Sequence, residues 1–214
     1  MNFFKKLFSS HKDTIANDKE TESQSDHQDQ VVTDKTSNNK NEVSMIYTEE
    51  YFAQRYVEEN IHDNPKLLDG SLKMIESYFI DNLIAQNVQS PVNHPNNLDQ
   101  VVEEGLGFQW YCKSFELDDQ ATIMFLTMGL SDFFINNFGF QLYKDNEPEF
   151  PLRSMTLKYN KNGAVLSLYP FEYALKVLNH EATFTGLFDK ISNHLENMPN
   201  VEDVLNNYTE KSPE

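Results

Sequence analysis

Two segments of alternating hydrophobicity flank an Asn162-Gly163 pair, and this pattern constrains the fold more than any other feature of the sequence. The first segment, SMTLKY, and the second, AVLSLY, alternate apolar and polar residues as half-buried strands do. A two-residue type I′ turn favours Asn-Gly because both of its central residues adopt a positive φ. The cross-strand pairs expected from that turn are Lys161–Ala164, Tyr159–Leu166, Lys158–Ser167 and Leu157–Leu168. The sequence therefore predicts an antiparallel hairpin, with FGFQLYK as a further strand before it.

Apolar residues spaced three and four apart predict helices on both sides of the hairpin. Asp118 and Gly139 are a suitable start and stop for one helix, and the stretch IMFLTMGL within it is apolar on every face. Pro170 suits the first position of the helix that follows the second strand. The other predicted helices are one within TEEYFAQRYVEEN capped by Thr48, those at residues 67–86, 98–115 and 184–195, and a last one capped by Asn200. We therefore expect an α+β fold in which a helical layer packs on a small antiparallel β-meander.

The composition of the chain changes sharply between its first residues and the predicted domain. Residues 9–44 contain only five apolar residues and keep no period of 3.6 or 2. Such a segment cannot bury enough apolar area to offset the entropy of the chain. We predict a disordered polar linker at residues 9–44, a single α+β domain at residues 45–210 and a short tail at residues 211–214.

Residues 1–8 form a short amphipathic segment before the linker. Its apolar residues, which share one face of two helical turns, are Phe3, Phe4, Leu7 and Phe8. Lys5 and Lys6 lie on the other face and interrupt the apolar run, so we expect no signal peptide. The pattern predicts a weak peripheral contact with a membrane, and the alternative is a frayed terminus.

The chain is strongly acidic, with 34 Asp and Glu residues against 17 Lys and Arg residues and a formal net charge of −17. Such a surface repels phosphate backbones, so we expect no binding to nucleic acid. It attracts a basic protein partner, although the charge also serves solubility alone. The single cysteine, Cys112, excludes a disulfide framework and fits a reducing cytosol, so we expect a cytoplasmic protein.

No familiar catalytic or cofactor motif occurs in the sequence. None of the six histidines has the spacing of metal ligands. The segment GLGFQW follows no predicted strand and lacks the third glycine of a dinucleotide-binding loop. Acidic doublets such as Glu103-Glu104 are sequence neighbours, and adjacent residues do not face one another on a helix. We therefore expect no catalytic residue, no metal site and no cofactor.

Asp132 and Arg153 are the two charged residues that stand out. Asp132 lies in the most apolar predicted helix, where its charge argues against a membrane span, and Arg153 is one of only two arginines in the predicted domain. A buried carboxylate needs a partner, so a structural ion pair between Asp132 and Arg153 is the favoured prediction. A role for Asp132 in binding a ligand or substrate and simple exposure to solvent are the alternatives.

Residues 124–180 show a longer pattern, in which GLSDFFINNFGFQLYKDNEPEFPLRS is followed by LSLYPFEYALKVL. This pattern resembles a bacterial family, domain of unknown function 3806. That family has a helix with Gly and Asp, a strand with Gly and an aromatic residue, an Asp-containing loop ending in Leu-Arg, and a strand ending in Pro. The matching positions are Gly129, Asp132, Gly139, Asp145, Leu152, Arg153 and Pro170, whereas Ser131 replaces a Gly and Leu142-Tyr143 replaces a Trp. The resemblance implies a bacterial α+β domain and implies no activity.

Two hypotheses about function follow from these observations. The first is a non-enzymatic binding protein that uses an acidic surface to bind a basic protein partner, and a toxin-neutralising immunity protein is one concrete case. The alternative is an enzyme or small-ligand binder with a site around Asp132 and Arg153. A deep pocket holding both side chains would favour the alternative, and an exposed acidic surface would favour the binding protein.

Overall fold

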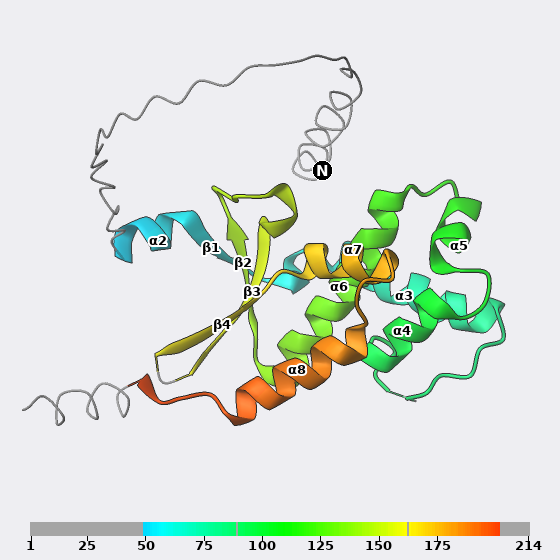
Figure 1. Ribbon diagram of the computed structural model, residues 1–214. Coiled ribbons are helices and arrows are strands. Elements are labelled where there is room, and N and C mark those ends of the chain that lie inside the picture. Colours follow the sequence, from blue (N-terminus) through cyan, green and yellow to red (C-terminus); the bar gives the residue numbers. More distant parts are fainter. Residues whose placement is uncertain (1–48, 89, 162, 202–214) are drawn as a thin grey trace, which may run out of the picture. The chain divides into compact units, whose positions relative to one another are not determined.

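The computed structural model of the chain describes residues 49–88, 90–161 and 163–201 (Figure 1). By its internal contacts the chain divides into two compact units, Met1–Phe52 and Ala53–Glu214. Of the first unit, the structure describes only the start of helix α2 (Glu49–Arg55). The predicted amphipathic segment 1–8, the linker 9–44, the tail 211–214 and the last predicted helix beyond Val201 lie outside the described residues.

A four-stranded antiparallel sheet has the order β1-β2-β3-β4 and belongs to the second unit. Its strands are β1 (Tyr56–Glu59), β2 (Gln141–Asp145), β3 (Met155–Lys161) and β4 (Ala164–Leu168). The β3–β4 hairpin pairs Lys161 with Ala164 and Leu157 with Leu168, which confirms the predicted register. Gly163 has a φ of +79°, the positive value that the predicted type I′ turn requires, and Asn162 lies outside the described residues. The meander confirms the predicted α+β class.

Six helices of the second unit lie beside this sheet, and Figure 1 labels them. They are α3 (Pro65–Asp81), α4 (Pro95–Glu103), α5 (Phe108–Ser114), α6 (Asp119–Phe138), α7 (Pro170–Leu178) and α8 (Phe184–Glu196). Two short 3₁₀ turns, η1 (Ile61–Asp63) and η2 (Pro151–Arg153), complete the described elements. Among the described helices, none combines the length and the hydrophobicity needed to cross a bilayer.

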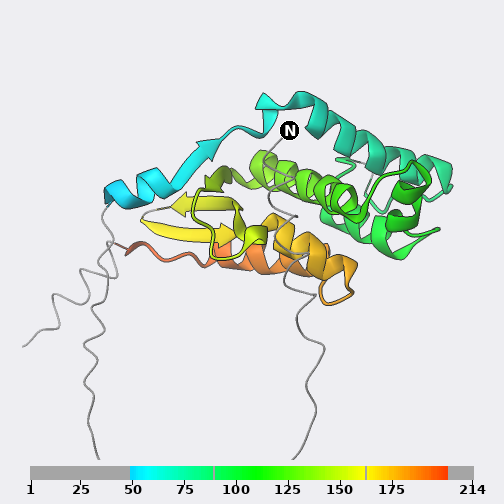
Figure 2. The same cartoon turned by 90° about the horizontal axis from the view of Figure 1, so that it is seen from above.

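Helix α6 forms the centre of the helical part, as its all-round apolar sequence predicts. Figure 2 shows α6 between α3 on one side and the α7–α8 pair on the other. The Asp118 side chain accepts a hydrogen bond from the Ala121 N–H at the start of α6, and Gly139 ends the helix in the left-handed conformation. Gly129 permits the close approach of α3, since a Cβ there would lie 3.0 Å from Cδ1 of Ile75.

The segment TEEYFAQRYVEEN contains a helix, as predicted, but its residues 56–59 form a strand that we did not predict. Helix α2 ends at Arg55, and the next residues pair with β2 so that Tyr56 lies opposite Asp145 and Glu59 opposite Leu142. The strand was missed because local periodicity does not reveal a partner strand far along the chain. Tertiary pairing overrides a weak local preference for helix.

Two glycines divide the helix that we predicted for residues 98–115. Gly105 and Gly107 have φ values of +74° and +87°, and they lie between α4 and α5. A positive φ ends a right-handed helix and is accessible mainly to glycine. Helix α3 is also shorter than predicted, since it ends at Asp81, before Leu83, whose φ is +54°.

Replacing Gly163 by valine is expected to lower the free energy of unfolding by about 1–3 kcal/mol, because a β-branched residue is strained at a positive φ. The added Cβ would also lie 3.4 Å from Cβ of Val201. The strain weakens the hairpin that holds Leu157 opposite Leu168. Urea denaturation followed by circular dichroism measures the change.

Gly70→Val is the matched control for this variant. Gly70 lies within α3, and a Cβ added there meets no atom within 4 Å. Valine has a higher helix propensity than glycine, so this variant is expected to keep or raise the stability. Equal losses in the two variants would contradict the assigned role of the Gly163 backbone conformation.

Candidate functional site

Asp132 lies in the buried part of α6, where two amide side chains hold its carboxylate. The Asn93 Nδ2 donates to Oδ2 of Asp132 at 3.0 Å, and the Asn136 Nδ2 donates to Oδ1 at 2.8 Å. The same Asn93 amide also donates to the carbonyl oxygen of Gly129 at 2.8 Å. The bonds from Asn93 link the connection between α3 and α4 to α6. Asp132 therefore has a structural role.

Arg153 lies at the end of η2 and contacts residues just before η2 and near the start of α7. Its Nε donates to Oε2 of Glu172 at 2.7 Å, and its Nη1 lies 3.7 Å from Oε2 of Glu149. The guanidinium also lies 5.0 Å from the ring centroids of Phe150 and Tyr169. Arg153 and then Lys176 lower the pKa of Glu172 by hydrogen bonding to its carboxylate.

The structure does not bring Asp132 and Arg153 together as the predicted ion pair. Arg153 belongs to the 3₁₀ turn η2, and its side chain binds Glu172. The carboxylate of Asp132 is instead satisfied by the neutral amides of Asn93 and Asn136. We therefore correct the prediction to two separate structural contacts.

The described residues also hold little that resembles a catalytic centre. Within residues 49–88, 90–161 and 163–201, no group of three or more His, Cys, Asp and Glu side chains could hold a metal ion. Burial raises the pKa of the Cys112 thiol, and a thiol that stays protonated is a poor nucleophile.

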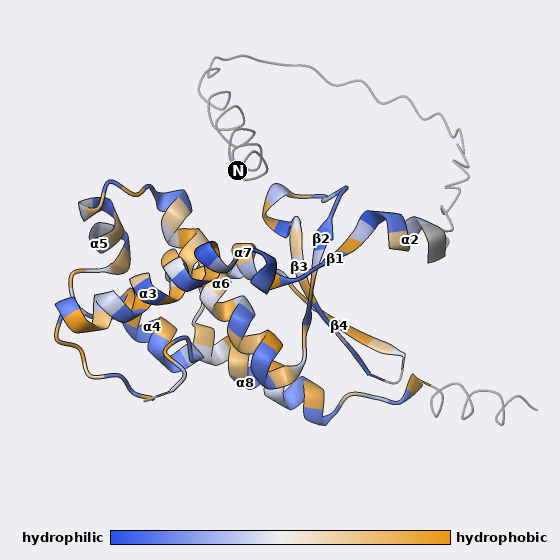
Figure 3. Ribbon diagram, turned by 180° about the vertical axis from the view of Figure 1, so that it is seen from behind, coloured by the Kyte–Doolittle hydropathy of each residue, from blue (hydrophilic) through white to orange (hydrophobic). Residues whose placement is uncertain are grey.

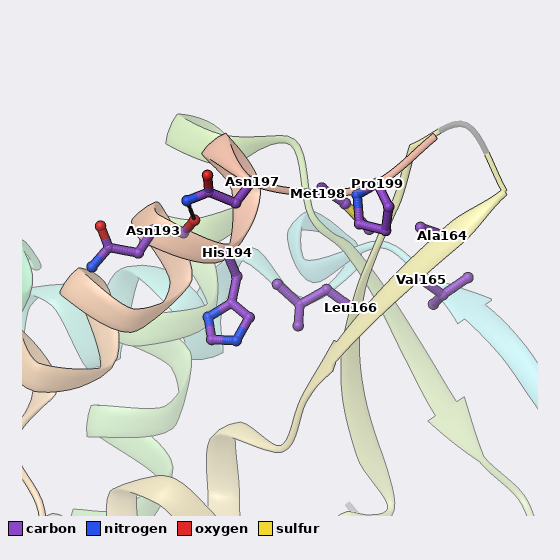
Figure 4. Close-up of a pocket in the computed structure, with 8 residues that line it drawn as sticks. All are labelled: Ala164, Val165, Leu166, Asn193, His194, Asn197, Met198 and Pro199. Carbon is purple, nitrogen blue, oxygen red and sulfur yellow. Dashed lines mark hydrogen bonds between the residues drawn. The ribbon is translucent and has the colours of Figure 1, made fainter. Parts of the chain in front are cut away.

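An open groove of about 510 Å³ lies between β4 and the end of α8. Figure 4 shows the His194 ring and the Leu166 side chain extending into the space between the helix and the strand. The Nδ1 of His194 lies 2.6 Å from the carbonyl oxygen of Lys190. The other lining residues are Ala164, Val165, Asn193, Asn197, Met198 and Pro199. His194 is the one titratable side chain among the lining residues, and no carboxylate, thiol or hydroxyl side chain accompanies it there, so the groove suits an apolar group better than a reaction.

Large apolar side chains are exposed near the end of α3, on the α4–α5 connection and on and next to α5. We call this set of residues the Trp110 patch, and it comprises Ile80, Leu83, Leu106, Trp110 and Phe115. Leu83 is 94% exposed, and Leu106 and Trp110 are each 74% exposed. Figure 3 shows hydrophobic residues along the connection that follows α3, at this end of the helical layer. Exposed apolar side chains that gather in one place mark interaction sites more often than single exposed ones do.

Hydrogen bonds hold the segments of the patch in place. The Tyr78 hydroxyl donates to the carbonyl oxygen of Glu104 and accepts from the Gly107 N–H at 2.9 Å. The Leu106 N–H donates to Oδ1 of Asn82 at 3.4 Å. These bonds connect the α4–α5 connection to the end of α3. The backbone around Leu106 is therefore held to α3 by side-chain hydrogen bonds.

Helix α5 is tied to α3 through Tyr111. The Tyr111 hydroxyl donates to Oδ2 of Asp81 at 2.5 Å, and the rings of Tyr111 and Phe115 lie 5.1 Å apart. Burial, together with the hydrogen bond to Asp81, raises the pKa of Tyr111 to about 12, so the hydroxyl keeps its proton and remains a donor. The Tyr111 ring, held to α3 by this hydrogen bond, in turn contacts the Phe115 ring and positions it.

A groove and a group of carboxylates adjoin the patch. The groove, of about 450 Å³, is lined by Phe79, Ile80, Ile84 and Gln86. The exposed acidic residues on the segments of the patch and next to them are Asp81, Glu103, Glu104, Glu116, Asp118 and Asp119. One basic residue, Lys113, lies among them, and its Nζ is 2.9 Å from Oδ1 of Asp119. Negative charge therefore exceeds positive charge on these segments.

Sequence reasoning did not identify the Trp110 patch. The helix predicted for residues 67–86 includes Leu83, but α3 ends before that residue. The available signal was the pair of glycines around Leu106, which end one helix and start another and so leave Leu106 on an exposed turn.

Comparisons with known proteins add no relative to these observations. A scan against protein-family models and searches among curated proteins and solved structures each gave no match.

Proposed function

We propose that the protein is a non-enzymatic binding protein that docks a basic protein partner on the Trp110 patch. The observation that carries this proposal is the exposure of five large apolar side chains near the end of α3, on the α4–α5 connection and on and next to α5, with six exposed carboxylates on the same segments or next to them. Tryptophan is enriched among the residues that dominate binding energy at protein interfaces. Burial of such side chains supplies affinity at roughly 25 cal/mol per Å² of apolar area.

The acidic border selects the charge of the partner. Glu103 and Glu104 lie just before the connection that carries Leu106, and Glu116 lies just after α5. Charges around an apolar patch increase the rate of association with an oppositely charged partner and disfavour partners of like charge. The net charge of −17 extends this attraction beyond the patch.

The alternative of an enzyme or small-ligand binder around Asp132 and Arg153 has less support. The two side chains have separate partners, and neither lines either of the two grooves described above. Arg153 is engaged with Glu172, and Asp132 with two amides. We therefore favour the binding protein.

The test uses capture of basic proteins from an extract of the source cells by the immobilised full chain. Two variants change the patch: Trp110→Ala, and the pair Glu103→Gln with Glu104→Gln. Two matched controls make the same changes elsewhere: Phe150→Ala, an exposed ring that also has a cation beside it, and Glu58→Gln with Glu59→Gln, an exposed acidic doublet.

We expect the wild type and both controls to retain the same basic protein, identified by mass spectrometry, and both patch variants to lose it. Retention of an identical set of proteins by all five chains would overturn the proposal. So would a retained set whose patch-dependent members are acidic or neutral, because the charge argument would then be wrong.

A further inference from the structure

We infer that β4 binds an extended segment of a partner protein, which adds to the sheet as a fifth strand. Alternate side chains of that segment, apolar and uncharged, enter the groove between β4 and the end of α8. The residues of this groove are not those of the Trp110 patch, so the inference goes beyond the proposed function.

The register of the β3–β4 hairpin determines which main-chain groups of β4 point away from β3. A two-residue turn closes with a hydrogen bond between the residues that flank it, which here are Lys161 and Ala164. Opposite residues of an antiparallel pair alternate between hydrogen-bonded and non-hydrogen-bonded positions, so Val165 and Ser167 occupy the non-hydrogen-bonded ones. The N–H and C=O groups of Val165 and Ser167 therefore point away from β3, toward the outer edge of the sheet.

The outer edge of β4 is open to a further strand. Within residues 49–88, 90–161 and 163–201, β3 is the only segment whose backbone forms hydrogen bonds with Ala164–Leu168. Natural sheets usually protect an exposed edge with charged residues, proline or a bulge. The other edge strand, β1, has Glu58 and Glu59, whereas the sequence of β4, AVLSL, contains no charge and no proline. An edge of this composition is suited to accept a partner strand.

The groove beside this edge gives the added strand a place for its side chains. Ala164, Val165 and Leu166 line it from β4, and the end of α8 with the residues that follow lines it from the other side (Figure 4). Side chains of an extended segment alternate between the two faces of a sheet, so every second residue of the partner faces this groove. In such complexes main-chain pairing supplies affinity, and pockets for alternate side chains supply specificity.

The charge of the groove favours an uncharged partner segment. No carboxylate or lysine side chain is among its lining residues, although 34 residues of the 214 in the chain are Asp or Glu. A charged side chain placed against Leu166, Met198 and Pro199 would lose its hydration without gaining a counter-ion. The segment that contacts this groove is therefore apolar and neutral, in contrast to the basic partner proposed for the Trp110 patch.

The probe is a fluorescein-labelled peptide of six residues, blocked at both ends, in which valine and threonine alternate. Two derivatives carry backbone N-methyl groups, one on its valines and the other on its threonines. Because the N–H groups of alternate residues point to opposite edges of a strand, each derivative loses the donors of one edge. A fourth peptide has lysine in place of valine. Fluorescence anisotropy with the full-length protein measures the dissociation constant of each peptide.

One methylated peptide is expected to bind as the parent does and the other on the order of tenfold more weakly, because only one edge of the peptide faces β4. The lysine peptide should also bind on the order of tenfold more weakly than the parent. Hydrogen exchange followed by NMR should show fast exchange of the Val165 and Ser167 amides in the free protein and slow exchange in the complex. Absence of binding by the parent peptide, equal effects of the two methylations, or unchanged exchange at these amides would each overturn the inference.

Proline substitutions test the same groups on the protein. Val165→Pro removes an outward N–H and leaves the hydrogen bonds to β3, so it should weaken binding of the parent peptide on the order of tenfold. Glu58→Pro is the matched control on the other edge strand. The Asn146 N–H donates to the carbonyl oxygen of Arg55, so by the same alternation the Glu58 N–H points outward. This control should leave peptide binding unchanged, and equal weakening by the two variants would contradict the inference. If Val165→Pro does not fold, the methylated peptides decide with the wild-type protein.

Two further measurements distinguish other occupants and other surfaces. If a second copy of the chain covers the edge, the protein alone sediments as a dimer and the Val165 and Ser167 amides exchange slowly without peptide, which would overturn the inference. Trp110→Ala should bind the parent peptide as the wild type does, because Trp110 does not line the groove. Loss of binding in that variant would place the peptide on the Trp110 patch instead of β4.

Discussion

Replacing Asp145 by alanine is expected to lower the free energy of unfolding by about 3 kcal/mol, in the range for loss of one partner from a buried ion pair. The Asp145 carboxylate, only 5% exposed, accepts two hydrogen bonds from Arg55, each 2.9 Å long. It also accepts the Glu147 N–H at 2.9 Å. Without this carboxylate, the Arg55 guanidinium and the Glu147 N–H lose an acceptor at a partly buried position. Urea denaturation measures the loss.

Asp119→Ala provides the matched control. Asp119 forms an ion pair with Lys113 at the same distance of 2.9 Å, but its side chain is 56% exposed. Exposed ion pairs contribute about 0–1 kcal/mol, because water screens the charges and the side chains lose entropy on pairing. A loss at Asp119 as large as that at Asp145 would show that burial does not decide the strength of these pairs.

Phe134→Ala is expected to destabilise the protein by about 4 kcal/mol, in the range for removal of a fully buried ring from a core. Phe134 is 0% exposed on α6. Its ring lies 5.4–5.8 Å from the rings of Phe133, Phe138 and Phe140. The cavity left by alanine removes these contacts without replacement. Thermal and urea denaturation of the purified variant measure the effect.

Two further variants make this prediction specific. Phe134→Leu keeps most of the volume and is expected to lose less than about 1.5 kcal/mol, which keeps the test informative if the alanine variant does not fold. Phe115→Ala removes a ring that is 52% exposed and should change the stability by less than about 1 kcal/mol. A larger loss at Phe115 than at Phe134 would contradict the assignment of the core.

The parts of the fold that were predicted correctly have signals close together in the sequence. Helix α6 begins after Asp118 and ends at Gly139, and both residues perform the capping roles that their chemistry suggests. The β3–β4 register follows from Gly163 and the alternation on either side of it. In each case the residues that specify the structure lie within or next to the element itself.

The errors share a different cause, which is that the deciding contact is distant or depends on the direction of a turn. Strand β1 pairs with residues far along the chain, and no local pattern reports that pairing. The partner of Arg153 depends on the η2 turn, which the sequence did not reveal. The Trp110 patch was missed because hydrophobicity alone does not distinguish a buried leucine from Leu106 on an exposed turn.

The pairing of β1 with β2 also has a consequence for the order of folding. Tyr56 lies opposite Asp145, and Arg55 contacts Asp145 across a separation of 90 residues. A contact between residues so far apart closes a long loop, whereas the β3–β4 hairpin closes over a two-residue turn. During synthesis, residues 56–59 leave the ribosome before β2 exists, so this strand must wait unpaired for its neighbour. The last two residues of this strand, Glu58 and Glu59, are charged and exposed. Charged side chains on an unpaired strand disfavour its pairing with another chain.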